Sequence, residues 1–96
     1  MMALAPTEAA IERKLVRECA KRGWLCLKQN VVGRRGYPDR LIIRPDGKHI
    51  WIELKRPGGR LSDNQKACID RLVKQKCDVY IGYSAEEVLA IVEQCQ

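Results

Sequence analysis

The chain has 96 residues, of which 46% are hydrophobic and 31% are charged. These proportions predict one folded domain over residues 1–96 and exclude a disordered, collagen-like or coiled-coil protein. The formal net charge is +6, and the isoelectric point of about 9.3 indicates a polyanionic partner such as nucleic acid. Because the chain shows neither a long apolar run nor a signal-peptide pattern, we expect a cytoplasmic protein that is not exported.

The cysteines do not form a recognisable metal or disulfide pattern. None of them has the Cys-x-x-Cys spacing of a zinc site, and an odd number in mostly apolar segments is typical of reduced, packed thiols. We therefore expect packing roles for all five residues, which are Cys19, Cys26, Cys68, Cys77 and Cys95.

The first two predicted elements are a helix and a strand. Thr7 can cap the helix, and apolar residues at helical spacing continue it to a stop near Gly23. Residues 24–32 are rich in large and branched apolar side chains, which predicts the first strand. A basic loop that contains Gly33 and Gly36 follows this strand.

A hairpin is predicted next. Asp39 opens the second strand over residues 40–44, and a third strand covers residues 49–55. Residues 45–48 read Pro-Asp-Gly-Lys, a tight-turn sequence that joins the two strands as antiparallel neighbours.

The last part of the chain predicts a helix, a strand and a helix. Ser62 and Gln65 form a capping-box pattern that begins a helix ending near Gln75. A short fourth strand covers residues 79–83, and Ser84 caps the final helix. The predicted order is therefore α-β-β-β-α-β-α, an α/β fold.

Positive charge is concentrated in the middle of the sequence. Residues 21–60 hold eleven basic and three acidic side chains, a net charge of +8, whereas the rest of the chain is slightly acidic. A solvated basic surface would have this charge, but the same segment could bind a phosphate backbone. The residues expected to contact nucleic acid are Lys28, Arg34, Arg35, Arg40, Arg56 and Arg60.

The acidic residues in this basic segment suggest a catalytic site. Glu53 and Lys55 are two residues apart on the third strand and share a face, and the hairpin brings Asp39 close to them. Neighbouring carboxylates repel one another unless a cation neutralises them, and oxygen ligands favour Mg²⁺ or Mn²⁺. Such an ion beside a lysine suits phosphodiester hydrolysis. Gly36 is expected to leave room for a phosphate to approach.

Several of these residues carry a family resemblance. The sequences Gly36-Tyr37-Pro38-Asp39 and Glu53-Leu54-Lys55, with Gln65 downstream, resemble the virus-type replication-repair nuclease (VRR-Nuc) domain of the PD-(D/E)xK nuclease superfamily. The resemblance extends from about Thr7 to Val92. It implies a restriction-endonuclease-like αβββαβ core with a C-terminal helix and a mixed four-stranded sheet. It also implies a stand-alone DNA-repair nuclease of the phage type, in a bacterial or phage-infected cell, rather than the C-terminal module of the Fanconi-anaemia-associated nuclease.

The resemblance assigns roles to the residues of the hairpin. It implies that Asp39 and Glu53 bind the metal ion together with the backbone carbonyl of Leu54. It implies that Lys55 is the catalytic lysine.

Two further assignments have structural alternatives. Glu12 resembles the additional acid on the first helix of archaeal Holliday-junction resolvases and could add a metal ligand, but Glu8 competes for this role and charged residues beside an apolar stripe are common. Gln65 would be the catalytic glutamine of this branch, although its place in the capping box already explains it structurally.

Together these features predict a Mg²⁺- or Mn²⁺-dependent endonuclease that hydrolyses structured or branched DNA, including Holliday junctions. We also expect a homodimer in solution, which would present two sites to a two-fold symmetric junction, with the apolar flank of the last helix or the first helix at its interface. A non-catalytic basic DNA-binding module and an RNA-processing nuclease of the same fold remain open as alternatives.

Overall fold

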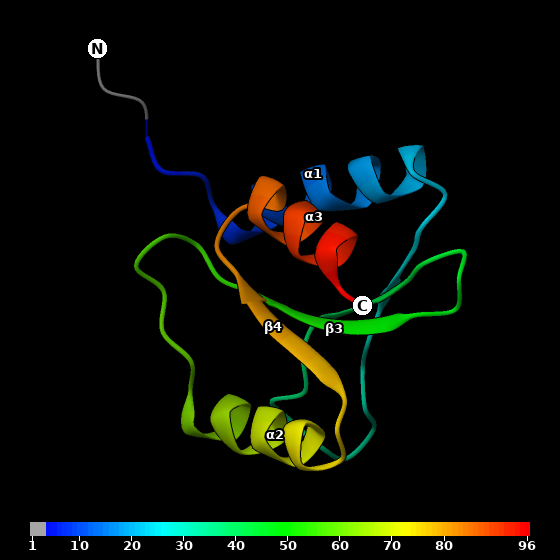
Figure 1. Cartoon of the computed structure of the whole chain (residues 1–96). Coiled ribbons are helices and arrows are strands. Elements are labelled where there is room, and N and C mark those ends of the chain that lie inside the picture. Colours follow the sequence, from blue (N-terminus) through cyan, green and yellow to red (C-terminus); the bar gives the residue numbers. More distant parts are fainter. Residues whose placement is uncertain (1–3) are drawn as a thin grey trace.

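The computed structural model describes residues 4–96 and has the element order predicted from the sequence (Figure 1). The elements are α1 (Glu8–Lys21), β1 (Leu25–Lys28), β2 (Arg40–Ile43), β3 (His49–Leu54), α2 (Asp63–Lys74), β4 (Asp78–Gly82) and α3 (Ala85–Gln94).

The strands form one mixed sheet in the order β1-β2-β3-β4. The pairs β1–β2 and β2–β3 are antiparallel, and β4 runs parallel to β3. The chain reaches β4 through α2, because parallel neighbours need a crossover connection. The mixed four-stranded α/β fold is therefore confirmed.

The helices lie on different sides of the sheet. Helices α1 and α3 pack together on one side, whereas α2 lies against β4 on the other (Figure 1). The core fills the space between the sheet, α1 and α3, and its fully buried side chains include Leu15, Ile42, Ile50, Ile52, Val88 and Val92. Because side chains alternate along a strand, Glu53 lies on the opposite face from Ile52.

The first strand is shorter than predicted. β1 ends at Lys28, and Val32 is 93% exposed, so the extension of this strand to Val32 is wrong. The Gln29 N–H still donates to the Asp39 carbonyl at 2.8 Å. This is the last backbone hydrogen bond of the pairing between the two segments, and the chain after Gln29 leaves the sheet.

The predicted helix caps are confirmed. Thr7, Ser62 and Ser84 each accept a hydrogen bond from a backbone N–H in the first turn of α1, α2 and α3, respectively. None of the helices within residues 4–96 is both long and apolar enough to cross a membrane.

The cysteines are all free thiols. Cys19 and Cys68 are buried, and Cys26, Cys77 and Cys95 are half-buried. Their burial agrees with the expected packing roles.

Candidate active site

Glu53 lies near the end of β3, on the side of the sheet opposite the main core. It is only 1% exposed. Its Oε1 accepts a hydrogen bond from Gln65 Nε2 at 2.8 Å and lies 4.0 Å from Lys55 Nζ. Its other oxygen, Oε2, is buried and has no hydrogen-bond partner among residues 4–96. An unpartnered buried carboxylate oxygen is costly, so this environment favours either a proton or a cation at Glu53.

Asp39 adds a second carboxylate at this place. It directly precedes β2 and follows the buried Pro38. Burial raises the pKa of Asp39, while a hydrogen bond from the Leu54 backbone amide and the positive charge of Lys55 oppose that rise. Burial, and secondly the negative charge of Asp39, raise the pKa of Glu53 to about 7. The structure therefore brings Asp39, Glu53 and Lys55 together as the hairpin predicted, and the two carboxylates repel each other.

Lys55 supplies the positive charge next to the carboxylates. Its backbone N–H donates to the Gly82 carbonyl of β4 at 2.9 Å, which holds the residue in line with β3. Its side chain is only 14% exposed, and its Nζ lies 4.0 Å from Glu53 Oε1. A lysine held in this way can stabilise negative charge on a nearby phosphate.

Gln65 connects the first turn of α2 to Glu53. Its Oε1 accepts a hydrogen bond from the Ser62 N–H at 2.8 Å, and Ser62 Oγ accepts one from the Gln65 N–H at 3.1 Å. These two bonds complete the predicted capping box. The amide nitrogen of Gln65 remains free for its bond to Glu53. The capping and site contacts are therefore made simultaneously by different atoms of one side chain.

The loop before Asp39 packs tightly against α2 at Gly36. A Cβ atom at this glycine would lie 2.5 Å from the Asn64 carbonyl oxygen and 2.9 Å from the Gln65 nitrogen, and the φ angle of Gly36 is +98°. The space that a side chain would need is thus filled by the backbone of α2. The expectation that Gly36 makes room for a phosphate is wrong, because the close approach is made by the helix.

Glu12 makes its contact with an arginine. Its Oε2 accepts a hydrogen bond from Arg40 Nε at 3.0 Å, and Arg40 also donates through Nη1 to the Cys26 carbonyl at 3.3 Å. Glu12 is nevertheless close enough for its charge to raise the pKa of Asp39. The structure thus places Glu12 beside the carboxylate pair but already partnered. The Arg40 guanidinium is therefore held by contacts within the protomer and is not free to bind a phosphate in the way that the sequence predicted. Glu8, which competes for the role of Glu12, is exposed, and its charge raises the pKa of Glu53 less than burial and the charge of Asp39 do.

The carboxylate pair has the chemistry to hold a divalent cation. Within residues 4–96 no cluster of three or more His, Cys, Asp and Glu side chains is arranged as a metal site. The structure brings together the carboxylates of Asp39 and Glu53 as donors, and the family resemblance implies the backbone carbonyl of Leu54 as a third ligand. The unpartnered Glu53 Oε2 and the raised pKa values of both acids fit an oxygen-rich cation site.

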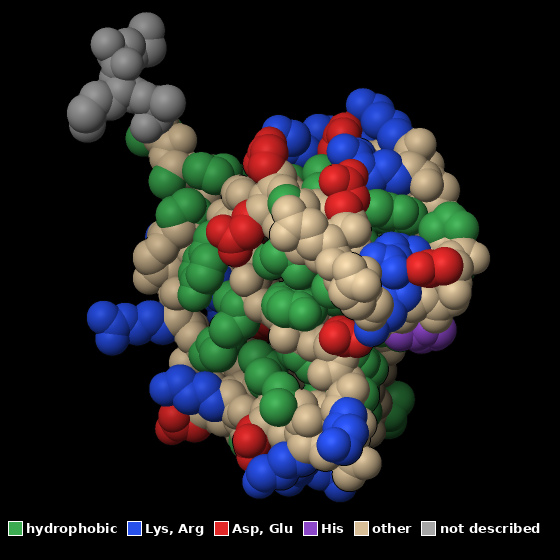
Figure 2. Space-filling model, viewed as in Figure 1, with side chains coloured by type: hydrophobic (Ala, Val, Ile, Leu, Met, Phe, Trp, Pro, Cys, Tyr) green, Lys and Arg blue, Asp and Glu red, His purple; other side chains and the backbone are tan. Residues whose placement is uncertain are grey.

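The other basic residues lie around this centre in different ways. The exposed Lys28, at the end of β1, is close enough to lower the pKa of Asp39. Arg56 and Arg60 are exposed in the segment between β3 and α2. Arg34 and Arg35 lie in the loop before Asp39 and, with Arg71 of α2, line a hollow between this loop and the helix. Figure 2 shows lysine and arginine side chains gathered around α2 at the lower end of the molecule.

Arg71 was missed by the sequence analysis. It lies outside residues 21–60, where the positive charge is concentrated, and its proximity to Arg34 depends on how α2 packs. Arg71 follows Cys68 by three residues on α2, and this spacing alone does not indicate a binding site.

Two solved structures share the fold. A structure titled "VRR_NUC domain" superposes with a TM-score of 0.82 at 24% sequence identity and covers 95% of this chain and 100% of its own. A second, titled "VRR_NUC domain protein", has a TM-score of 0.76 at 16% identity and covers 95% and 88% of the two chains. These similarities confirm the fold.

Sequence comparison adds the family. "Putative nuclease p44" of Acyrthosiphon pisum secondary endosymbiont phage 1 is 49% identical over 51 residues, which are 53% of this chain and 55% of that protein. The chain thus aligns with about half the length of this curated relative. The VRR-NUC domain family matches residues 5–86. Because this match includes every element from α1 to β4 and the fold agrees with it, the chain belongs to the VRR-NUC domain family and carries a nuclease domain.

Proposed function

We propose that the chain is a divalent-metal-dependent endonuclease that hydrolyses phosphodiester bonds in branched or otherwise structured DNA. The observation that carries this proposal is the buried Glu53 carboxylate, which has one unpartnered oxygen and lies beside Asp39 and Lys55. On a surface that only binds nucleic acid, two neighbouring carboxylates would weaken binding, because they repel each other and also repel the phosphates.

The metal site of this proposal consists of Asp39, Glu53 and the Leu54 carbonyl, with Mg²⁺ or Mn²⁺ as the ion. A divalent cation held by these groups would act as a Lewis acid toward the phosphate and would lower the pKa of a bound water. The protein contributes the arrangement of its own groups. Gln65 holds one oxygen of Glu53 by a hydrogen bond, which leaves the other oxygen available.

Lys55 has a separate role in the proposed reaction. Its ammonium group lies 4.0 Å from Glu53 Oε1 and stabilises the negative charge that develops on the phosphate. Glu12 acts on the site through its charge, since its carboxylate is held by Arg40.

The proposed substrate and assembly are linked by symmetry. A four-way junction is approximately two-fold symmetric, and one protomer contributes one active site, so a C₂ dimer would address both strands. We therefore propose that the enzyme acts as a homodimer on such junctions. The exposed apolar side chains of the edge strand β1, Leu25 and Leu27, are the surface we favour for its interface.

Cleavage of a panel of DNA substrates tests the proposal. The panel contains four-way, flap and linear DNA with matched RNA versions, each incubated with Mg²⁺, Mn²⁺ or EDTA. We expect metal-dependent cleavage of branched DNA, loss of cleavage in Asp39→Asn and Glu53→Gln, and unchanged or tighter DNA binding by both variants because each loses a negative charge. Asp70→Asn, on the exposed surface of α2, is the matched control and should cleave normally.

The Lys55→Ala variant separates catalysis from metal binding. It should lose most of the cleavage rate and still bind Mn²⁺ in a metal titration, because the lysine acts on the phosphate. Wild-type rates in Asp39→Asn or Glu53→Gln would disprove the assigned metal site. Preferential cleavage of the RNA versions would replace DNA by RNA as the substrate.

A further inference from the structure

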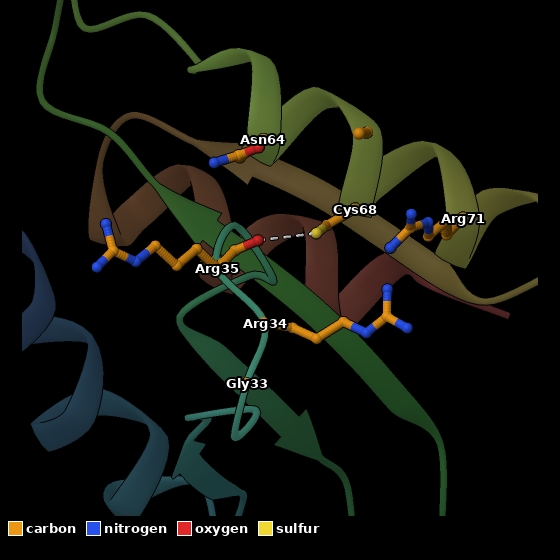
Figure 3. A pocket seen from close by; sticks show the side chains of 7 residues that line it. Gly33, Arg34, Arg35, Asn64, Cys68 and Arg71 are labelled. Carbon is orange, nitrogen blue, oxygen red and sulfur yellow. Dashed lines mark hydrogen bonds between the residues drawn. The ribbon is translucent and has the colours of Figure 1, made fainter.

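A hollow lies between the loop that precedes Asp39 and the exposed face of α2. Its volume is about 430 Å³, and the residues around it include Arg34, Arg35, Asn64, Cys68 and Arg71. Figure 3 shows the guanidinium groups of Arg34 and Arg71 on one side of the Cys68 side chain, with Arg35 extending in the opposite direction. The hollow is thus bordered by cations that come from two separate segments of the chain.

The positive charge of this hollow is not neutralised by the protein. No acidic residue lines it, and within residues 4–96 the guanidinium groups of Arg34, Arg35 and Arg71 form no salt bridge. The nearby Asp70 of α2 is paired with Lys74 at 2.9 Å. Among the other arginines, Arg22, Arg40 and Arg44 are each paired with an acid. Unpaired arginines also occur elsewhere among residues 4–96, but at this hollow they come together from two segments. Uncompensated arginines around one concave site favour an anion, and the guanidinium fork suits phosphate in particular.

The loop is attached to α2, so the arginines are held in place. The Cys68 thiol donates a hydrogen bond to the Arg35 carbonyl at 3.2 Å. Gly36 touches the backbone of Asn64, with no space for a side chain between them. These contacts fix the backbone beside Arg34 and Arg35 against the helix that carries Arg71, which lowers the entropic cost of arranging the cations around a ligand.

The contact between Gly36 and Asn64 lies next to both the hollow and the carboxylate pair in the sequence. Gly36 lies three residues before Asp39, and Asn64 directly precedes Gln65, which binds Glu53. The loop and the helix that border the hollow are thus the same two segments that lead to Asp39 and Glu53.

We propose that the hollow binds a backbone phosphate of the nucleic-acid substrate, on the strand that is cut but away from the reacting phosphate. This inference rests on the proposed nuclease function. Arg34 and Arg71 supply the main contacts and Arg35 adds positive charge to the rim. The site holds the strand in position and takes no part in the chemistry.

DNA binding in EDTA tests this site without requiring cleavage. A labelled four-way junction is titrated with wild-type protein, Arg71→Ala, Arg34→Ala and the control Lys74→Ala, between about 50 and 200 mM salt. Lys74→Ala removes one positive charge from the same helix outside the hollow. We expect each arginine variant to raise Kd about three- to tenfold and to reduce the slope of log Kd against log salt by about one, with a smaller change in Lys74→Ala. The melting temperature should stay at the wild-type value in all variants, since these side chains are exposed.

The outcomes separate this inference from the proposed function. If both arginine variants keep the wild-type salt slope, or if Lys74→Ala changes it equally, the phosphate site is disproved even when the protein cleaves DNA. If the arginine variants lose slope and affinity but wild-type protein cleaves no substrate with Mg²⁺ or Mn²⁺, the phosphate site stands and the nuclease proposal fails.

Discussion

Gln65 makes two different hydrogen bonds with the two ends of its side-chain amide. Its oxygen caps α2 through the Ser62 N–H, and its nitrogen binds Glu53. The cap thereby determines which way the amide is turned, so that a donor faces the carboxylate. At the scale of single residues, helix capping and the arrangement of the site thus depend on one side chain.

The variants Gln65→Glu and Ser62→Ala separate these two functions. Gln65→Glu keeps an oxygen for the cap but places a third carboxylate against Glu53, so we expect a cleavage rate about ten- to a hundredfold lower and a pH profile shifted to higher pH. Ser62→Ala removes the capping hydroxyl at a cost of about 1 kcal/mol and leaves the bond to Glu53, so it should lower the melting temperature more than the rate. Cleavage kinetics between pH 6 and 9 and thermal melting measure both effects. A wild-type rate and pH profile in Gln65→Glu would show that Gln65 only caps the helix.

Glu53 also makes the stability of the metal-free protein depend on pH. Its pKa is raised from 4.5 to about 7 in the folded state, so the folded protein holds a proton that the unfolded chain has lost. The free energy of unfolding should therefore fall as the pH rises from about 4.5 to 7, by about 1.4 kcal/mol for each pKa unit that separates the two states. Glu53→Gln should lack this part of the decrease and be more stable than wild type at pH 8.

Urea unfolding in EDTA at several pH values measures this difference. Adding Mn²⁺ at pH 8 should stabilise the wild-type protein and not Glu53→Gln, because an ionised pair of carboxylates is needed to bind the cation. Parallel pH dependences in the two proteins would show that Glu53 is not the group responsible.

At the scale of elements, α2 is the part that organises the site. Its first turn contacts Glu53 through Gln65 and the loop before Asp39 through Gly36. It is also the crossover that makes β4 parallel to β3. Packing of this one helix thus couples the sheet, the loop and the carboxylates.

Gly36→Ala tests this coupling against a matched glycine. Gly36 and Gly58 both have positive φ angles, +98° and +81°, but a Cβ at Gly58 would meet nothing within 4 Å. Gly58→Ala should cost only the backbone strain, about 1 kcal/mol. Gly36→Ala should cost about 1–3 kcal/mol more, since loop and helix must separate, and it should reduce cleavage by moving Asp39. Urea unfolding and cleavage assays of the two variants provide the comparison, and equal effects would contradict the importance of this contact.

At the scale of the whole molecule, the exposed apolar surface does not lie where the predicted dimer interface would need it, on the first or the last helix. The apolar stripes of α1 and α3 are buried inside the protomer, where Leu15 and Val88 are fully inaccessible. These buried side chains are therefore not available for the interface that the sequence suggested. The edge strand β1 instead exposes Leu25 and Leu27, which are 56% and 40% accessible.

Sedimentation equilibrium at micromolar concentration tests the proposed dimer. We expect a species of twice the 11.0 kDa chain mass without DNA, and a monomer for the double variant Leu25→Asp/Leu27→Asp. Val73→Asp changes another exposed apolar residue, on α2, and should remain dimeric. A concentration-independent 11.0 kDa species for wild-type protein would rule out the dimer in solution.

The local parts of the site were predictable from the sequence. Turn residues and alternation defined the hairpin, and a hairpin pairs neighbouring segments in a known register, so Asp39, Glu53 and Lys55 were expected to converge. The helix caps are likewise interactions within a few residues, and Thr7, Ser62 and Ser84 cap their helices as predicted.

Only the tertiary structure decided which distant residues meet. Glu12 pairs with Arg40 across 28 positions, and Cys68 reaches the Arg35 carbonyl across 33. These contacts depend on which face of the sheet each helix covers and on how close α2 approaches the loop, and neither is encoded in a short sequence pattern. The same packing brings Arg71 beside Arg34 and pairs Arg40 with Glu12 inside the protomer. The sequence could not predict these positions, because the charge of a residue does not indicate which residue it will contact in the folded protein.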